Sequence, residues 1–244
     1  MKKFFMFLAV FGLVAFAADS ALAQEANELS VATDIPVYQQ IKIKFIEGGA
    51  GFMATVLLCL IFGLAIVIER IIYLNMATTN TTKLLNKIEG ALNEGGIEAA
   101  KDVCRNTRGP VASIFYQGLL RADEGVEMVE KSVVSYGGVQ MSQLESGLSW
   151  ITLFIAIAPS LGFLGTIIGM IAAFDAIAIA GDISPNIVAG GMKVALITTV
   201  GGLIVAIILQ LFYNYLVSKI DSLVLAMEDS SIALVDMIAA YNKR

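Results

Sequence analysis

Three long runs without a charged residue constrain this chain more than any other feature. Residues 48–68, 151–174 and 194–218 are uncharged over 21, 24 and 25 residues. As helices, with a rise of about 1.5 Å per residue, all three can cross the roughly 30 Å hydrocarbon core of a bilayer. Only 15% of the chain is charged and 57% is hydrophobic, whereas about a quarter of a soluble domain is charged. We therefore predict an all-α, three-span membrane helix bundle.

The amino terminus has the pattern of a secretory signal peptide. Lys2 and Lys3 precede an apolar stretch at residues 4–18, and the small-x-small sequence Ala-Leu-Ala follows at 21–23. We expect residues 1–23 to be a signal peptide, with an uncleaved first membrane helix as the alternative. Residues 24–47 then form a periplasmic segment, with an amphipathic helix after the breaker Pro36.

The distribution of Lys and Arg predicts the orientation of the spans. Eight of these residues lie between the first and second apolar runs, whereas the second connection, residues 176–188, contains none. Because basic loops stay in the cytoplasm, we predict a multi-pass inner-membrane protein with a periplasmic N-terminus and a cytoplasmic C-terminus. From Met141 onward we expect an unbroken helix into the second span. The expected segments are the first span at 48–74, a cytoplasmic helical region at 75–147, the second span at 148–178, a periplasmic loop at 179–186, the third span at 187–218 and a cytoplasmic C-terminal helix at 219–244.

Two of the spans carry a helical face of small residues. The spacing that repeats one helical face joins Gly162, Gly165, Thr166, Gly169 and Ala173 in the second span, and Gly191, Ala195, Thr198, Gly202 and Ala206 in the third. Small faces let membrane helices approach closely, so the glycines predict helix packing. The two threonines have two readings. A membrane threonine can bond its own backbone, or Thr166 and Thr198 can line a narrow polar ion pathway.

Asp175 and Lys193 are charged residues near the outer ends of the second and third spans. Each lies nine residues from Ser184, at the middle of the connection, so two regular helices place them at the same depth. An unpaired charge at this depth is costly. We predict a rim ion pair between them, within one chain or between neighbouring copies.

Composition and motifs argue against several other functions. The chain has no histidine and a net charge of −5, so it lacks the commonest metal ligand and any basic surface for nucleic acid. It has no G-x-S-x-G sequence and no metal-ligand cluster. Cys59 and Cys104 are expected to be reduced and unpaired. We expect no enzymatic activity, no metal, no cofactor and no nucleic-acid partner.

Two motifs resemble those of the ExbB/TolQ/MotA family. Residues 158–170, APSLGFLGTIIGM, resemble the second-span motif of ExbB and TolQ, a helix with proline followed by G-x-x-G-T-x-x-G. Residues 190–203, GGMKVALITTVGGL, resemble the third-span motif, G-I-x-x-A-L-x-x-T-x-x-G-L. The resemblance is strongest over about residues 140–220. One departure is Lys193, because the best-known members carry a glutamate at that position.

The resemblance to ExbB implies a ring subunit, a homopentamer, of an ion-driven motor in the inner membrane. It implies a single-span ExbD- or TolR-like partner whose membrane aspartate carries the ion past Thr166 and Thr198. It also implies a TonB-like protein, through which the proton (or sodium) gradient energises TonB-dependent outer-membrane transport. The alternatives are a TolQ-like envelope-maintenance subunit, a gliding or flagellar motor subunit, and a membrane scaffold that conducts no ion.

Overall fold

The computed structural model describes residues 36–181 and 185–242, and every regular element in these ranges is a helix. This confirms the all-α prediction. The chain divides into two units, residues 1–46 and 47–244. The first contains α2 (Val37–Glu47), which directly follows Pro36, except for its last residue, Glu47, which belongs to the second unit. The expected signal peptide, residues 24–35 and residues 182–184 of the expected loop lie outside the described ranges.

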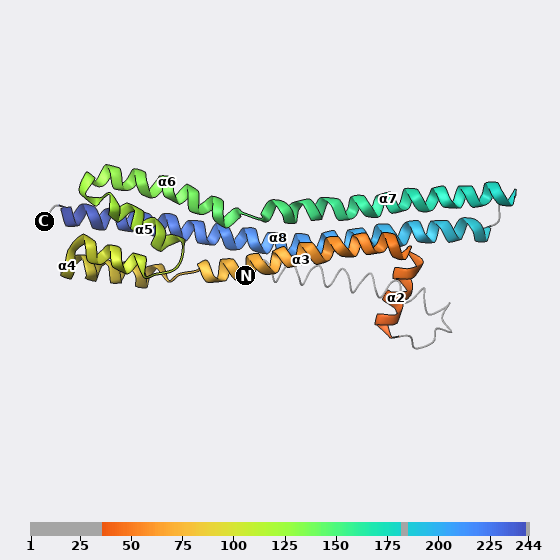
Figure 1. The fold of residues 1–244 in the computed structure, drawn as a ribbon, viewed down its shortest axis with the longest axis horizontal. Helices are drawn as coiled ribbons and strands as arrows, with labels where there is room; N and C mark the ends of the chain where they lie inside the picture. The colour runs from red at the N-terminus through yellow and green to blue at the C-terminus, as the bar shows by residue number, and fades with distance from the viewer. Residues whose placement is uncertain (1–35, 182–184, 243–244) are drawn as a thin grey trace. The chain divides into compact units, whose positions relative to one another are not determined.

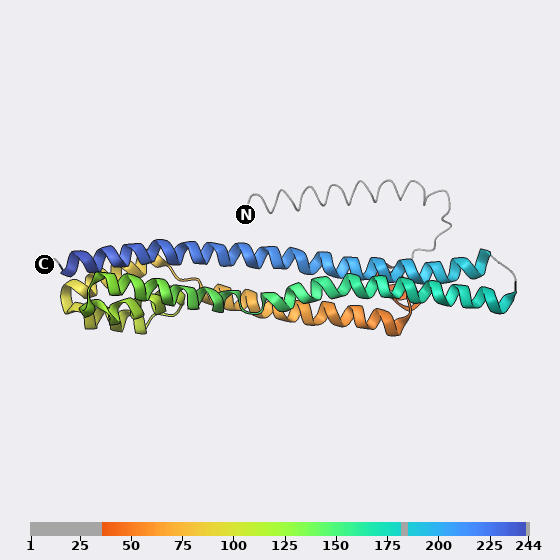
Figure 2. The same ribbon diagram turned by 90° about the horizontal axis from the view of Figure 1, so that it is seen from above.

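The second unit consists of long helices that lie side by side (Figure 1). Its elements are α3 (Ala50–Ala77), α4 (Thr81–Arg105), α5 (Pro110–Leu120), the short 3-10 helix η1 (Ala122–Glu124), α6 (Val126–Glu145), α7 (Leu148–Ala180) and α8 (Pro185–Asn242). Figures 1 and 2 show α3 and α7 along one half of α8, and α4, α5 and α6 along its other half. Three helical segments are long and apolar enough to span a membrane, and their apolar stretches are those of α3, α7 and α8.

Helix α8 is the central element of this unit. It runs 58 residues without interruption, about 87 Å at 1.5 Å per residue, so it is far longer than one membrane crossing. A third of its most apolar stretch is buried within the protein, against 22% of the corresponding stretch in each of the other two candidate spans. The expected third span and C-terminal helix are therefore one continuous helix. Pro185 begins it, a position where the missing N–H costs no helical hydrogen bond.

The helix expected to be continuous from Met141 onward is broken, and this prediction is wrong. Helix α6 ends at Glu145, and α7 begins at Leu148. Between them Ser146 is extended and Gly147 has φ +84°, a conformation that side chains with a Cβ rarely adopt. The packing of Arg70 against Gly147 fills the bend, since a Cβ at this glycine would lie 2.8 Å from the Arg70 Nε atom.

Arg70 joins the end of the first apolar run to this bend. Its guanidinium lies over the ring of Tyr73, at 5.2 Å from the ring centre. Its Nε atom is 2.9 Å from a Glu69 carboxylate oxygen, although the N–H is not aimed well enough at that oxygen for a hydrogen bond. The Arg70 side chain, just after the uncharged stretch of α3, thus lies at the bend between α6 and α7.

The helices beyond the apolar stretches pack around one hydrophobic core. Phe115, Ile88 and Leu234 are fully buried in it and come from α5, α4 and α8. Cys104 belongs to the same core and forms no disulfide. Burial raises the pKa of its thiol to about 12, so the reactive thiolate is absent at neutral pH.

The bend at Gly147 gives a stability prediction. Gly147→Ala should destabilise the protein by about 1–2 kcal/mol, because alanine is strained in the left-handed region. Gly90→Ala is the matched control. This glycine lies inside α4 with open space around a new Cβ, so alanine should stabilise by about 0.5–1 kcal/mol. Thermal unfolding in mild detergent measures both. An equal rise in melting temperature for the two variants would contradict the strained bend.

Candidate functional site

The small faces of α7 and α8 pack against each other at backbone distance. A Cβ on Gly162 would lie 3.0 Å from the Thr198 carbonyl oxygen, and one on Gly169 would lie 3.1 Å from the Ala195 nitrogen. From the other side, a Cβ on Gly202 would lie 3.1 Å from the Gly162 Cα atom. Glycine leaves room for this approach, which brings backbone carbonyls of one helix within reach of side chains of the other.

Three hydroxyl groups and two carbonyls converge at the centre of this contact, and we call them the threonine cluster. The hydroxyls are those of Thr166, Thr198 and Thr199, and the carbonyls are those of Gly162 and Ala195. Thr166 donates across the helix pair to the Ala195 oxygen at 3.1 Å. Thr198 lies 2.8 Å from the same oxygen. The hydroxyls of Thr166 and Thr199 contact each other directly.

The hydrogen-bond partners leave the cluster rich in acceptors. Each hydroxyl has one hydrogen and two lone pairs, and each helix carbonyl keeps one lone pair beyond its backbone bond. Two hydrogens are taken by the carbonyls of Gly162 and Ala195, and the third lies between Thr166 and Thr199. Every hydrogen then has an acceptor, whereas most hydroxyl lone pairs remain unused. The cluster is therefore suited to a cation or to a water that carries a proton.

The surroundings of the cluster are apolar and uncharged. Thr198 is 1% exposed, whereas Thr166 and Thr199 are half-buried. Phe52 of α3 reaches the same level, since a Cβ on Gly165 would lie 2.6 Å from its ring and 2.7 Å from the Thr198 Cβ. Residues 158–173 and 194–218 contain no charged residue. Neither of these two segments therefore supplies an acidic group to the cluster.

Thr199 is a candidate residue that the sequence reasoning missed. The helical face drawn through Gly191, Ala195 and Thr198 leaves it to one side, yet its hydroxyl lies 3.3 Å from the Ala195 oxygen. The available signal was its position four residues after Ala195, which brings a side chain back over the same turn of a helix.

Lys193, near the start of α8, forms an ion pair with a different residue from the predicted partner Asp175. The Lys193 Nζ atom lies 2.7 Å from the Oε1 atom of Glu47, next to the start of α3. Asp175 is exposed and has no ion-pair partner among residues 36–181 and 185–242. The predicted pair between Asp175 and Lys193 is therefore not formed within the described chain. A pair between neighbouring copies stays a prediction.

Comparisons with known proteins give the family. The model of the MotA/TolQ/ExbB proton channel family matches residues 106–229, about half of the chain. A putative biopolymer transport protein ExbB homolog of Methanothermobacter thermautotrophicus is 33% identical over 163 residues, 66% of this chain and 57% of that one. Biopolymer transport protein exbB1 of Vibrio cholerae is 45% identical over 69 residues, 28% of this chain and 30% of that one. The chain thus spans less than two thirds of either relative.

A solved structure gives the same fold. The structure of C. jejuni MotAB aligns with a TM-score of 0.50 at 15% identity, over 95% of this chain and 88% of that one. This likeness concerns the fold, whereas the family model shows the family: the chain belongs to the MotA/TolQ/ExbB proton channel family. It is a multi-pass membrane protein of a class associated with ion flow.

The ion pair at Lys193 gives a double-mutant prediction. Glu47→Gln and Lys193→Gln should show a coupling free energy of about 0.2–1 kcal/mol, because both side chains are partly exposed. The coupling should fall as salt is raised. Asp175→Asn is the control and should not couple to Lys193→Gln within a protomer. Thermal unfolding at low and high salt measures the cycle. Coupling of Lys193 to Asp175 instead would indicate a pair between neighbouring copies.

Proposed function

We propose that this chain is the ring-forming, ion-conducting subunit of a motor driven by a proton (or sodium) gradient. The threonine cluster carries the proposal. A cation in the apolar centre of a membrane loses its hydration at a high free-energy cost. Hydroxyl lone pairs from Thr166, Thr198 and Thr199 offer it replacement oxygens at mid-helix, in a family named for proton channels.

The absence of a charged side chain in the cluster's own helical segments argues for a partner. A proton can move along hydroxyls and water. A site that binds the proton between two steps of transport needs a group that titrates, such as a carboxylate. Residues 158–173 and 194–218 contain no charged side chain that could do so. We propose that a single-span ExbD- or TolR-like protein supplies this group as a membrane carboxylate. The related C. jejuni structure likewise contains MotA together with MotB.

The proposed assembly is a homopentameric ring in the inner membrane. The small-residue contact of α7 and α8 uses one face of each helix, and large apolar side chains such as Phe163, Phe174 and Leu196 remain 62–64% exposed. These exposed faces have the composition of surfaces that meet lipid or further helices. The Lys and Arg bias supports a periplasmic N-terminus and a cytoplasmic C-terminus.

The proposed use of the motor is to energise TonB-dependent outer-membrane transport, through a TonB-like protein. The names of the curated relatives, ExbB and biopolymer transport proteins, favour this use. A TolQ-like role in the envelope or a gliding motor uses the same membrane part with a different third protein. A scaffold without ion flow is the alternative from another class, in which the threonines serve packing alone.

Removal of the hydroxyls tests the ion pathway. Thr166→Ala or Thr198→Ala should lower ion flux through the reconstituted complex at least tenfold, while assembly stays intact. Thr198→Ser, which retains a hydroxyl, should keep most of the flux. Thr152→Ala is the matched control, because this exposed threonine of α7 bonds its own helix at Leu148. Full flux in both alanine variants would overturn the pathway and favour the scaffold.

Purification tests the partner. The tagged chain, extracted in mild detergent from its own host, should bring down a small single-span protein with an aspartate in its membrane helix, in fewer copies than the ring. Mass spectrometry identifies this protein and any TonB-like or Tol-like third component, which names the process. A ring that repeatedly comes out alone, even after cross-linking, would remove the basis for a partnered motor.

A further inference from the structure

Helix α6 presents two different surfaces on opposite sides. Glu130, Val134 and Met141 line a groove on one side, whereas Met128 and Val139 lie on the other. At 100° per residue, the centres of the two sets of lining residues are about 160° apart. One chain thus carries two separate surfaces on a helix that lies beyond the apolar stretch of α7.

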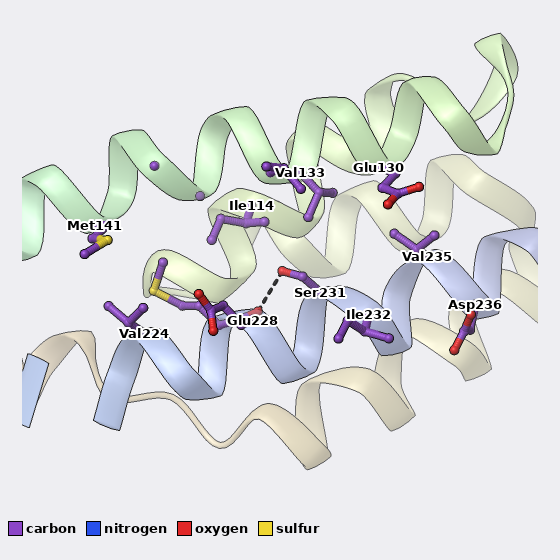
Figure 3. Close-up of a pocket in the computed structure, with 14 residues that line it drawn as sticks. Ile114, Glu130, Val133, Met141, Val224, Glu228, Ser231, Ile232, Val235 and Asp236 are labelled. Atoms are coloured by element: carbon purple, nitrogen blue, oxygen red, sulfur yellow. Dashed lines mark hydrogen bonds between the residues drawn. The ribbon is translucent and has the colours of Figure 1, made fainter. Parts of the chain in front are cut away.

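The first surface is a groove of about 680 Å³ between α6 and α8, which we call the acidic groove (Figure 3). Its apolar part is open, since Val134 is 70% and Ile232 is 65% exposed. Three carboxylates stand around it, those of Glu130, Glu228 and Asp236. None of the three forms an ion pair with a residue of the described ranges.

The second surface, which we call the Lys131 face, combines exposed apolar side chains with basic ones, whereas the acidic groove combines them with carboxylates. Met128 and Val139 are 38% and 49% exposed on it, with Lys131 between them along the helix. Arg121 lies at its edge, in an ion pair of 3.0 Å with Glu124. Lys131 has no such partner among the described residues. The Lys131 face therefore offers apolar side chains around a free cation.

We propose that the acidic groove of one copy receives the Lys131 face of the next. The apolar side chains of each surface would cover those of the other, and Lys131 would meet the unpaired carboxylates. Two different surfaces in contact make a head-to-tail interface, which repeats from copy to copy and can close into a ring. This inference rests on the proposed self-association and names the surfaces that produce it outside the membrane. An anionic lipid surface does not fit, because three carboxylates would repel it.

Disulfide trapping tests the contact. The double variant Lys131→Cys with Glu228→Cys, oxidised in native membranes, should give a ladder of covalent oligomers longer than dimers. Each single variant should give at most a background dimer. Lys87→Cys with Glu228→Cys is the matched control, since Lys87 is exposed on α4 and lines neither surface. The native Cys59 and Cys104 are both buried, so they should not contribute.

Charge reversal adds a second measurement that does not depend on cysteine geometry. Lys131→Glu should weaken self-association in detergent roughly tenfold or more, because it places like charges in contact. Adding Glu228→Lys to the same chain should restore most of it by reversing the pair. Circular dichroism is the control for folding, and both variants should keep their helix content because both positions are exposed.

The outcomes separate this inference from the proposed ring. If the double cysteine variant forms oligomers of wild-type mass but gives no ladder on oxidation, the proposed contact is wrong and the proposed ring is unaffected. A monomer by native mass spectrometry, with no ladder, would overturn both. Trapping of the Glu228→Cys variant to a basic helix of another protein, without self-cross-links, would also overturn the contact. A ladder from the 131/228 pair with rescue by charge exchange would support it.

Discussion

The close backbone contact between α7 and α8 is the interaction on which the rest of the membrane part depends. In lipid there is no hydrophobic gain from bringing two apolar helices together, so dispersion contacts and hydrogen bonds have to hold them. Gly162, Gly169 and Gly202 allow these contacts by removing the side chains that would separate the helices. The same approach brings the hydroxyl of Thr166 to the carbonyl of Ala195 on the facing helix.

The chemistry of the site follows from that geometry. At a wider helix separation, each threonine would satisfy its hydrogen from its own helix and present nothing distinctive. At this separation, three hydroxyls share two carbonyls and each other, and the lone pairs left over form a polar spot inside an apolar bundle. Helix packing and the proposed ion pathway therefore use the same pair of helical faces. The glycines that pack the helices also create the acceptor-rich cluster.

Outside the apolar stretches, the long α8 organises the structure in a different way. It carries the line of contact with α7 at one half and the core with α4, α5 and α6 at the other. Because α8 is continuous, a single helix joins the threonine cluster to the acidic groove. The path from α7 to α6, by contrast, passes through the bend at Gly147.

The sequence by itself determined the spans, their number and the two small faces, because a membrane requires long uncharged helices and glycine periodicity is local. The tertiary structure alone decided the rest. Arg70, which lies far away in the chain, packs against the bend at Gly147. Thr199 joins the cluster, and Lys193 meets Glu47, because of how helices dock. Periodicity within one helix cannot specify which groups on another helix lie opposite.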